Sequence, residues 1–259
     1  MNAIYQPKGR AREYSPLALN LYTTCAHGCQ YCYCRRLRGT GFDCNLPEPR
    51  AGIVSALKRQ IERDGAPKQQ VMLSFMGDPF GPSTDNNQVT LDALDVLADA
   101  KVPVAVLTKS GTGCLRGMDA FKRFGEHVMV GQSLTFLDDA DSLSIEPGAA
   151  TPSDRLAALE ELHDAGIKTF ASFEPVIDPE QSLMLMEDST EYIDVYKVGK
   201  INNWRGVDKT IDWNDFLQRA LDILRGAGKA VYVKEDLRRE ASSVHLYGSE
   251  VLADDFTVL

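Results

Sequence analysis

The segment LALNLYTTCAHGCQYCYC, residues 17–34, places a cysteine-rich loop directly after an apolar, strand-like run. Four of the six cysteines in the chain, Cys25, Cys29, Cys32 and Cys34, fall within ten positions of this loop. The polar residues 1–16 lack the apolar core of a signal peptide, so we expect a cytoplasmic, reducing location without a membrane. In that setting, clustered thiols are more typical of a metal or catalytic site than of disulfides.

Six further apolar runs alternate with helical patterns along the rest of the chain. The runs cover residues 70–76, 103–109, 127–136, 168–177, 193–201 and 229–235. The helical patterns cover residues 51–65, 90–101, 118–125, 153–166, 179–188 and 212–228. Near-continuous apolar strands between helices indicate a parallel sheet covered by helices. The sequence therefore predicts an α/β fold, specifically a partial or near-complete (β/α)6-type TIM-like barrel.

Local signals predict how some helices begin and end. Gly65 is expected to close the first helix, and Gly166 the fourth, while Ser153 or Asp154 is expected to cap the start of the fourth. No Pro-, Gly- or Ser-rich linker divides the chain, so one domain is predicted over residues 1–259. It would comprise a basic arm (1–15), a barrel core (16–205) and a C-terminal helix, strand and tail (206–259). In such barrels the chemistry lies at the carboxyl ends of the strands, where the cysteine loop falls.

The charge of the chain is unevenly distributed. Its net charge is −9, which argues against a general coat for nucleic acid. Residues 1–40 nevertheless carry six basic side chains against the single acid Glu13: Lys8, Arg10, Arg12, Arg35, Arg36 and Arg38. This segment is either a solvated basic loop or a basic rim that attracts an anionic substrate.

Cys25, Cys29 and Cys32 form a C-x3-C-x2-C pattern of soft thiolate ligands. Three thiolates on a four-iron cluster would leave one iron open to a small molecule, and such a site can be catalytic. The alternative is a zinc site with Cys34 or His27 as fourth ligand, in a binding module without catalysis. Zinc sites usually pair two C-x2-C knuckles, and no second one occurs here. Cys34 is expected to lie near the reaction centre without being a ligand.

The sequence CAHGCQYC (25–32), after a strand and with an aromatic residue before its third cysteine, resembles the cluster loop of the radical S-adenosylmethionine (SAM) superfamily. Its longer context, residues 17–36, is similar to the spore-photoproduct-lyase-like branch. The resemblance continues through SFMGDPFGPSTDNN (74–87), VPVAVLTKSG (102–111) and residues 130–167, so that it covers roughly residues 15–178.

The resemblance implies a barrel of the radical SAM kind and an enzyme of lyase, isomerase or transferase type. Cys25, Cys29 and Cys32 would hold a [4Fe–4S] cluster whose fourth iron binds S-adenosylmethionine. A one-electron donor such as flavodoxin or ferredoxin would reduce the cluster, and cleavage of the cofactor would give a 5′-deoxyadenosyl radical that takes hydrogen from the substrate. The chemistry belongs to the cofactors, while the protein supplies position and excludes water.

The resemblance also implies contacts to SAM along the first strands. Tyr31 would cover the adenine, or pack against the cluster. Gly77 and Asp78 would bring backbone groups to the amino group of the cofactor, or simply form a turn that ends the strand. Lys109, at the end of an apolar strand, would meet the cofactor carboxylate.

Three further residues are implied contacts on and after the fourth strand. Ser133 would reach the ribose or the methionine part of SAM. Glu146 would meet the ribose hydroxyls, and Arg155 the carboxylate. Glu146 and Arg155 could instead form a salt bridge at the entry of a helix.

Polar residues near the later strand ends are candidate substrate contacts, together with Cys34: Glu174, Lys197, Lys200 and Asn202, extended by Asn203, Trp204, Lys234 and Glu235. The substrate is expected to be a nucleobase or nucleotide, or alternatively a small metabolite or peptide. Repair of the photoproduct itself is not expected, because SFMGDPFGP (74–82) lacks the cysteine that returns hydrogen in the lyase.

Overall fold

The computed structural model describes residues 2–34, 46–202, 204 and 207–252. One sheet has its eight strands in chain order, and all pairs are parallel except β1 with β2. The strands are β1 (Ile4–Tyr5), β2 (Leu17–Leu19), β3 (Val71–Leu73), β4 (Val104–Thr108), β5 (Val128–Ser133), β6 (Lys168–Phe173), β7 (Val195–Val198) and β8 (Ala230–Val233).

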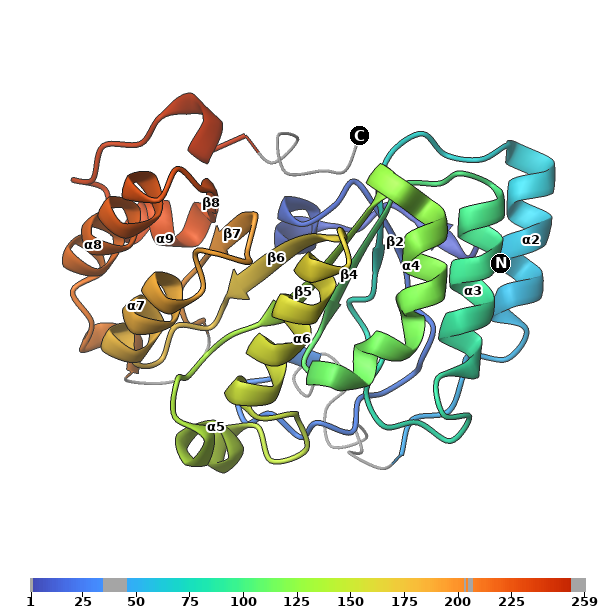
Figure 1. The fold of residues 1–259 in the computed structure, drawn as a ribbon, viewed down its shortest axis with the longest axis horizontal. Helices are drawn as coiled ribbons and strands as arrows, with labels where there is room; N and C mark the ends of the chain where they lie inside the picture. The colour runs from blue at the N-terminus through green and yellow to red at the C-terminus, as the bar shows by residue number, and fades with distance from the viewer. Residues whose placement is uncertain (1, 35–45, 203, 205–206, 253–259) are drawn as a thin grey trace.

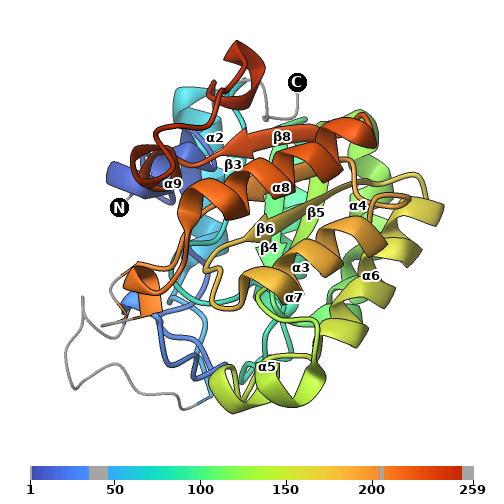
Figure 2. The same ribbon diagram turned by 90° about the vertical axis from the view of Figure 1, so that its left-hand side faces the viewer.

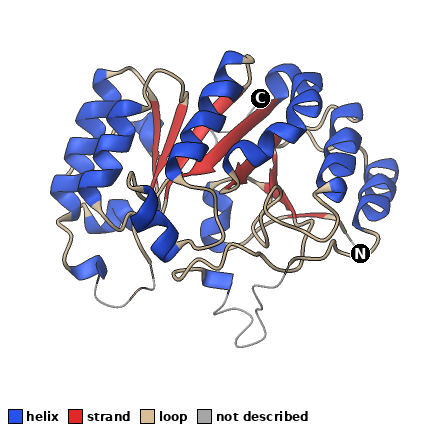
Figure 3. Ribbon diagram, turned by 60° about the horizontal axis from the view of Figure 1, so that its bottom comes forward, coloured by secondary structure: helices blue, strands red, loops and turns tan. Residues whose placement is uncertain are grey.

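Helices cover one face of this curved sheet (Figures 1 and 3). They are α2 (Ile53–Asp64), α3 (Gln88–Asp99), α4 (Met118–Phe124), α6 (Pro152–Asp164), α7 (Pro179–Asp188) and α8 (Trp213–Gly226). Two short helices, α5 (Asp139–Ile145) and α9 (Glu235–Glu240), follow β5 and β8. In the described residues the sheet ends at β1 and β8 and does not close. The predicted partial α/β barrel is confirmed.

Each of the seven predicted strand regions contains a strand, but the sheet is larger than six strands. The strand expected in the C-terminal segment pairs with β7 and becomes the seventh parallel strand, β8. The two-residue β1 lies in the segment expected to be a basic arm, and it pairs with β2. A two-residue strand is too short to give an alternating pattern, which explains why the sequence does not reveal it.

Alternate strand residues divide the apolar core between two faces. Leu19, Leu73 and Val106 point to the layer of helices, where they join the larger clusters. Ala18, Met72, Ala105, Met129, Phe170 and Tyr232 form a separate cluster with Tyr14 inside the partial barrel. The barrel interior is therefore packed with side chains beneath the site.

The ends of two helices test the predicted local signals. Gly65 closes α2 with a φ of 82°, and Gly166, with a φ of 77°, follows the last turn of α6. The start of α6 differs from the expected caps, because Thr151 accepts a hydrogen bond from the Asp154 backbone N–H at 3.3 Å. Pro152 occupies the first helical position, which it favours, and this moves the cap to the preceding residue.

Residues 2–15 run across the open side of the barrel, beside β8 and α9 (Figure 2). Glu13, at the end of a 3-10 helix (Gly9–Glu13), accepts hydrogen bonds from the Tyr232 hydroxyl at 3.0 Å and the Glu235 N–H at 2.7 Å. Ser15 donates to the Gln70 carbonyl at 2.7 Å, beside β3. These bonds at both ends pack the segment over the unclosed side of the barrel.

In the parts of the chain that the structure describes, no helix is both long enough and apolar enough to cross a bilayer.

Candidate active site

A cavity of about 540 Å³ opens at the carboxyl ends of the parallel strands. Twelve of the fifteen predicted site residues line it: Cys25, Cys29, Tyr31, Cys32, Cys34, Gly77, Asp78, Lys109, Ser133, Glu174, Lys200 and Asn202. The other three, Glu146, Arg155 and Lys197, lie behind its wall. The fold thus gathers residues from seven strand ends around one space, as expected for the carboxyl face of a barrel.

The cysteine loop is fixed to the turn that follows α5. The Gln30 N–H donates to the Ile145 carbonyl at 2.9 Å, and the Gly148 N–H donates to the His27 carbonyl at 2.8 Å. A Cβ at Gly148 would lie 2.5 Å from the Ala26 carbonyl oxygen, so only glycine allows this approach. Residues far from the loop in the sequence therefore fix the position of the thiols.

The thiols differ in exposure and in the charges around them. Cys29 is buried, whereas Cys25 and Cys32 are half-buried on the cavity wall. Burial raises the pKa of Cys29 to about 11, although the charge of Lys109 acts in the opposite direction. Burial and then the charge of Asp78 raise the pKa of Cys25. Cys25 and Cys29 are therefore protonated at neutral pH in the metal-free protein, and a bound metal has to displace their protons.

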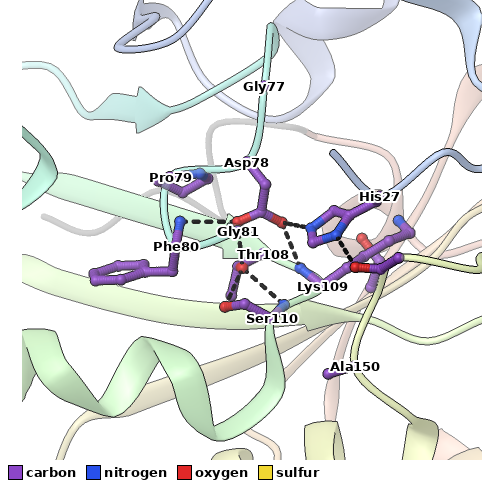
Figure 4. A network of polar contacts seen from close by, with 12 residues as sticks. His27, Gly77, Asp78, Pro79, Phe80, Gly81, Thr108, Lys109, Ser110 and Ala150 are labelled. Carbon is purple, nitrogen blue, oxygen red and sulfur yellow. Dashed lines mark hydrogen bonds and ion pairs between the residues drawn. The ribbon is translucent and has the colours of Figure 1, made fainter. Parts of the chain in front are cut away.

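Asp78 is the centre of a buried hydrogen-bond network (Figure 4). One carboxylate oxygen, Oδ2, accepts from the His27 Nε2 at 2.8 Å and the Lys109 N–H at 2.7 Å. The other, Oδ1, accepts from the Thr108 hydroxyl at 2.5 Å and the Phe80 N–H at 2.9 Å. Burial would raise the pKa of Asp78, but His27 and the hydrogen bonds hold it at about 2. The Asp78 side chain is thus saturated by protein donors, and only its backbone remains for the predicted cofactor contact.

His27 has no nitrogen available for a metal. Its Nδ1 lies 2.8 Å from the Gly148 carbonyl oxygen, which can only accept, and its Nε2 faces Asp78. Within the described parts of the chain, no three His, Cys, Asp or Glu side chains converge to hold a single metal ion. The zinc alternative therefore loses His27 as its fourth ligand.

The chain after β3 takes a conformation that requires glycine. Gly77 has a φ of 83°, and a Cβ there would lie 2.5 Å from the Thr24 carbonyl oxygen. Asn20 holds this segment by accepting hydrogen bonds from the Phe75 and Met76 N–H groups, each at 2.9 Å. Backbone groups of Gly77 consequently reach the cavity wall beside the cysteine loop.

Glu146 and Arg155 form a completely buried ion pair at 2.5 Å. Arg155 also donates to the Ser133 carbonyl at 2.8 Å and the Ala150 carbonyl at 2.9 Å. Lys109 Nζ lies 3.9 Å from Glu146, and the Tyr31 hydroxyl donates to the same carboxylate. Burial would raise the pKa of Glu146, but Lys109 and Arg155 hold it below its ordinary value.

This geometry favours the salt bridge, the second of the two roles considered for Glu146 and Arg155. Neither side chain lines the cavity, so both act on it through Tyr31 and Lys109. Trp204 adds an aromatic neighbour, since its ring centroid lies 6.2 Å from that of Tyr31.

A second polar group lines the cavity at the ends of β6 and β8. The Tyr14 hydroxyl lies 2.7 Å from Ser172 Oγ and donates to Glu174 at 2.9 Å. Lys234 pairs with Glu174 and lies over the Tyr14 ring, 4.3 Å from its centroid. Tyr14 was absent from the sequence-based candidates, because a tyrosine near the N-terminus carries no motif and meets Glu174 only in the fold.

The remaining predicted substrate residues have internal partners. Lys200 pairs with Glu240 at 2.9 Å, and Asn202 donates to the Lys200 carbonyl at 3.1 Å. Lys197 lies beneath Tyr14, to whose carbonyl it donates at 3.3 Å, and does not reach the cavity. Burial, with the nearby charge of Lys234, lowers the pKa of Lys197 to about 7.

The basic segment contributes two cations to the cavity, Lys8 and Arg10, and Arg10 is paired with Asp236. Arg12 is exposed and does not line the cavity, and Arg35, Arg36 and Arg38 lie outside the described residues, as does Asn203.

Most of the described barrel matches a known protein family. The family model described as the radical SAM superfamily matches residues 19–193. The chain belongs to the radical SAM superfamily. Members of this family use SAM and an iron–sulfur cluster.

Two relatives resemble the chain in sequence, and both are uncharacterised. An uncharacterised protein of Mycobacterium tuberculosis is 26% identical over 185 residues, which cover 68% of this chain and 52% of that protein. An uncharacterised protein of Methanocaldococcus jannaschii is 28% identical over 163 residues, 61% of this chain and 60% of the relative. The chain therefore spans between about half and three fifths of the length of these relatives.

Solved structures share the fold. SuiB of Streptococcus suis bound to S-adenosylmethionine has a TM-score of 0.61 at 16% identity, over 90% of this chain and 54% of that one. A spore photoproduct lyase mutant with bound AdoMet and dinucleoside spore photoproduct has a TM-score of 0.59 at 16% identity, over 83% and 63% of the two chains. SuiB bound to the precursor peptide SuiA has a TM-score of 0.63 at 15% identity, over 89% of this chain and 53% of that one.

Proposed function

We propose that the protein holds a [4Fe–4S] cluster on Cys25, Cys29 and Cys32, cleaves SAM reductively, and takes a hydrogen atom from a substrate. One observation carries the proposal: three thiols of one loop lie on the wall of the cavity that also receives Gly77 and Lys109. Three irons of a cubane would each take one thiolate, so the three sulfurs would not need to converge on one point as they would for zinc.

A cluster held by Cys25, Cys29 and Cys32 would supply the electron for the reductive cleavage of SAM. The residues of the chain position this reaction. Lys109 is the candidate for the cofactor carboxylate, because its ammonium lies at the cavity wall, 3.9 Å from the buried Glu146. Gly77 brings backbone to the same wall, and Ser133 provides a hydroxyl at the end of β5.

The rings of Tyr31 and Trp204 flank this cofactor side of the site. Tyr31 is held by its hydrogen bond to Glu146, and the Lys109 ammonium lies 5.8 Å from the Tyr31 ring centroid. This arrangement suits an apolar cover for the adenine and keeps water from the cleaved bond.

The substrate is proposed to lie against the β6–β8 side of the cavity, where Tyr14, Ser172, Glu174 and Lys234 form a polar group. Glu174 and Lys234 neutralise one another, and the hydroxyls supply donors and acceptors. Such a surface suits a polar, uncharged group such as a nucleobase edge, and we favour a nucleobase or nucleotide substrate. A peptide amide has the same hydrogen-bonding character and is the alternative.

Anaerobic reconstitution tests the proposal. We expect a brown protein that absorbs near ~400 nm with about four irons and matching sulfide. Reduced by flavodoxin or ferredoxin, it should convert SAM to 5′-deoxyadenosine, and a Cys29→Ala variant should do neither. A colourless protein with one zinc would contradict the proposal. Transfer of deuterium from candidate substrates into 5′-deoxyadenosine then identifies the substrate class.

A further inference from the structure

His27 and Asp78 are almost completely buried, yet their side chains have no role in the proposed contacts with cofactor or substrate. The two side chains are 3% and 7% exposed, and they meet across 51 positions of sequence. Buried polar side chains cost free energy unless they are hydrogen-bonded, and these two are fully bonded. Their position at the edge of the cavity points to a role in the site.

The pair joins four separate segments (Figure 4). His27 belongs to the cysteine loop and Asp78 to the chain after β3. At the end of β4, Asp78 accepts a hydrogen bond from the Lys109 N–H at 2.7 Å. In the turn after α5, the His27 Nδ1 lies 2.8 Å from the Gly148 carbonyl oxygen. The loop that carries the thiols is thus tied directly to both segments that carry the proposed cofactor contacts.

These bonds are well suited to fix a distance. Hydrogen bonds to an ionised carboxylate are about twice as strong as neutral ones, and burial strengthens them further. Imidazole and aspartate have few rotatable bonds, so little entropy opposes the arrangement. A shift of the cysteine loop relative to the Lys109 backbone would break a bond at Oδ2 of Asp78, because this oxygen lies within hydrogen-bond distance of both His27 Nε2 and the Lys109 N–H.

We propose that His27 and Asp78 are positioning residues, which set the distance between the cluster thiols and the SAM-binding edge formed by Gly77 and Lys109. This inference rests on the proposed function. Neither side chain touches cofactor or substrate; each acts through the segments that it holds.

The test compares Asp78→Asn, His27→Gln and the double variant after anaerobic reconstitution. We expect each variant to keep its iron while its affinity for SAM falls by about 10- to 100-fold, the range for residues that orient metal-site groups. The EPR signal of the reduced cluster should shift less on addition of SAM than in the wild type. Because the residues act as one unit, the double variant should lose little more affinity than either single variant.

Asp194→Asn is the matched control. Asp194 also accepts hydrogen bonds from a backbone N–H, that of Thr169 at 2.8 Å, and from the Thr169 hydroxyl at 3.2 Å. This contact lies at the amino-terminal ends of β6 and β7, on the far side of the barrel from the site. Its loss should lower stability without changing SAM affinity. If Asp78→Asn fails to retain a cluster, Thr108→Val carries the test, because it deletes only one donor to Asp78.

Wild-type SAM affinity in variants that hold a full cluster, or an equal loss of affinity in Asp194→Asn, would overturn the inference. Additive losses in the double variant would also overturn it, since they show that the two residues act separately. Failure of the proposed function is distinguishable, because the wild-type protein itself would then bind neither iron nor SAM.

Discussion

Replacing Arg155 by methionine should destabilise the protein before any cofactor is involved. Methionine is close in volume and removes the guanidinium, which donates to Glu146 at 2.5 Å and to the Ser133 and Ala150 carbonyls at 2.8 and 2.9 Å. Both charged side chains are completely buried. The substitution leaves a buried carboxylate with Lys109, 3.9 Å away, as its remaining cation.

The expected cost follows from these contacts. Removing one partner of a buried ion pair typically costs about 3–5 kcal/mol, because the other charge stays buried. For a chain of this size, each kcal/mol lowers Tm by about 2–4 °C, so a drop of roughly 6–20 °C is expected. The double variant Arg155→Met/Glu146→Gln should recover much of the loss, because it leaves no buried charge unpaired.

The assay is thermal unfolding of the cluster-free protein, followed by circular dichroism. Arg155 was also considered as a contact to the cofactor carboxylate, and that role predicts a different result. If Arg155→Met unfolds at the wild-type temperature in the cluster-free state but binds SAM weakly after reconstitution, the structural reasoning is wrong.

Three further outcomes are expected. Lys109→Ala should weaken SAM binding while the iron content stays at the wild-type level; loss of the cluster would show that Lys109 is structural. Cys34→Ala should leave the iron content unchanged, whereas a drop would make Cys34 a ligand. Lys197→Met should stabilise the protein most below pH 7, with the advantage shrinking at higher pH. The lowered pKa of about 7 means that the unfolded chain keeps a proton there that the folded protein has released. Wild-type stability should therefore gain, from this group, about 1.4 kcal/mol per pH unit above pH 7 until the unfolded lysine titrates, and urea unfolding at several pH values measures the difference. A constant difference between the two proteins would contradict the buried, titrating amine.

Much of the fold was predictable because its signals are local. Buried parallel strands are continuous apolar runs, and all seven predicted strand regions contain one. Short elements escaped prediction, since β1 has two residues and α9 has six, and too few positions lie in them to establish a period.

The sequence by itself predicted the chemistry proposed for the site. Three thiols at C-x3-C-x2-C spacing in one loop predict a cluster site wherever the chain folds, because their spacing is a property of a continuous segment. Seven apolar strands alternating with helices likewise determine that the loop lies at the carboxyl face of a partial barrel.

Only the tertiary structure decided which polar side chains line the cavity and which bond to other groups inside the protein. Tyr14 reaches Glu174 across 160 positions, and His27 reaches Asp78 across 51. Arg155 forms a buried ion pair with Glu146, although its sequence context suited a cofactor contact equally well. Burial and hydrogen-bond pairing are properties of the packed molecule, and a charged residue near a strand end gives no local sign of which partner it will meet.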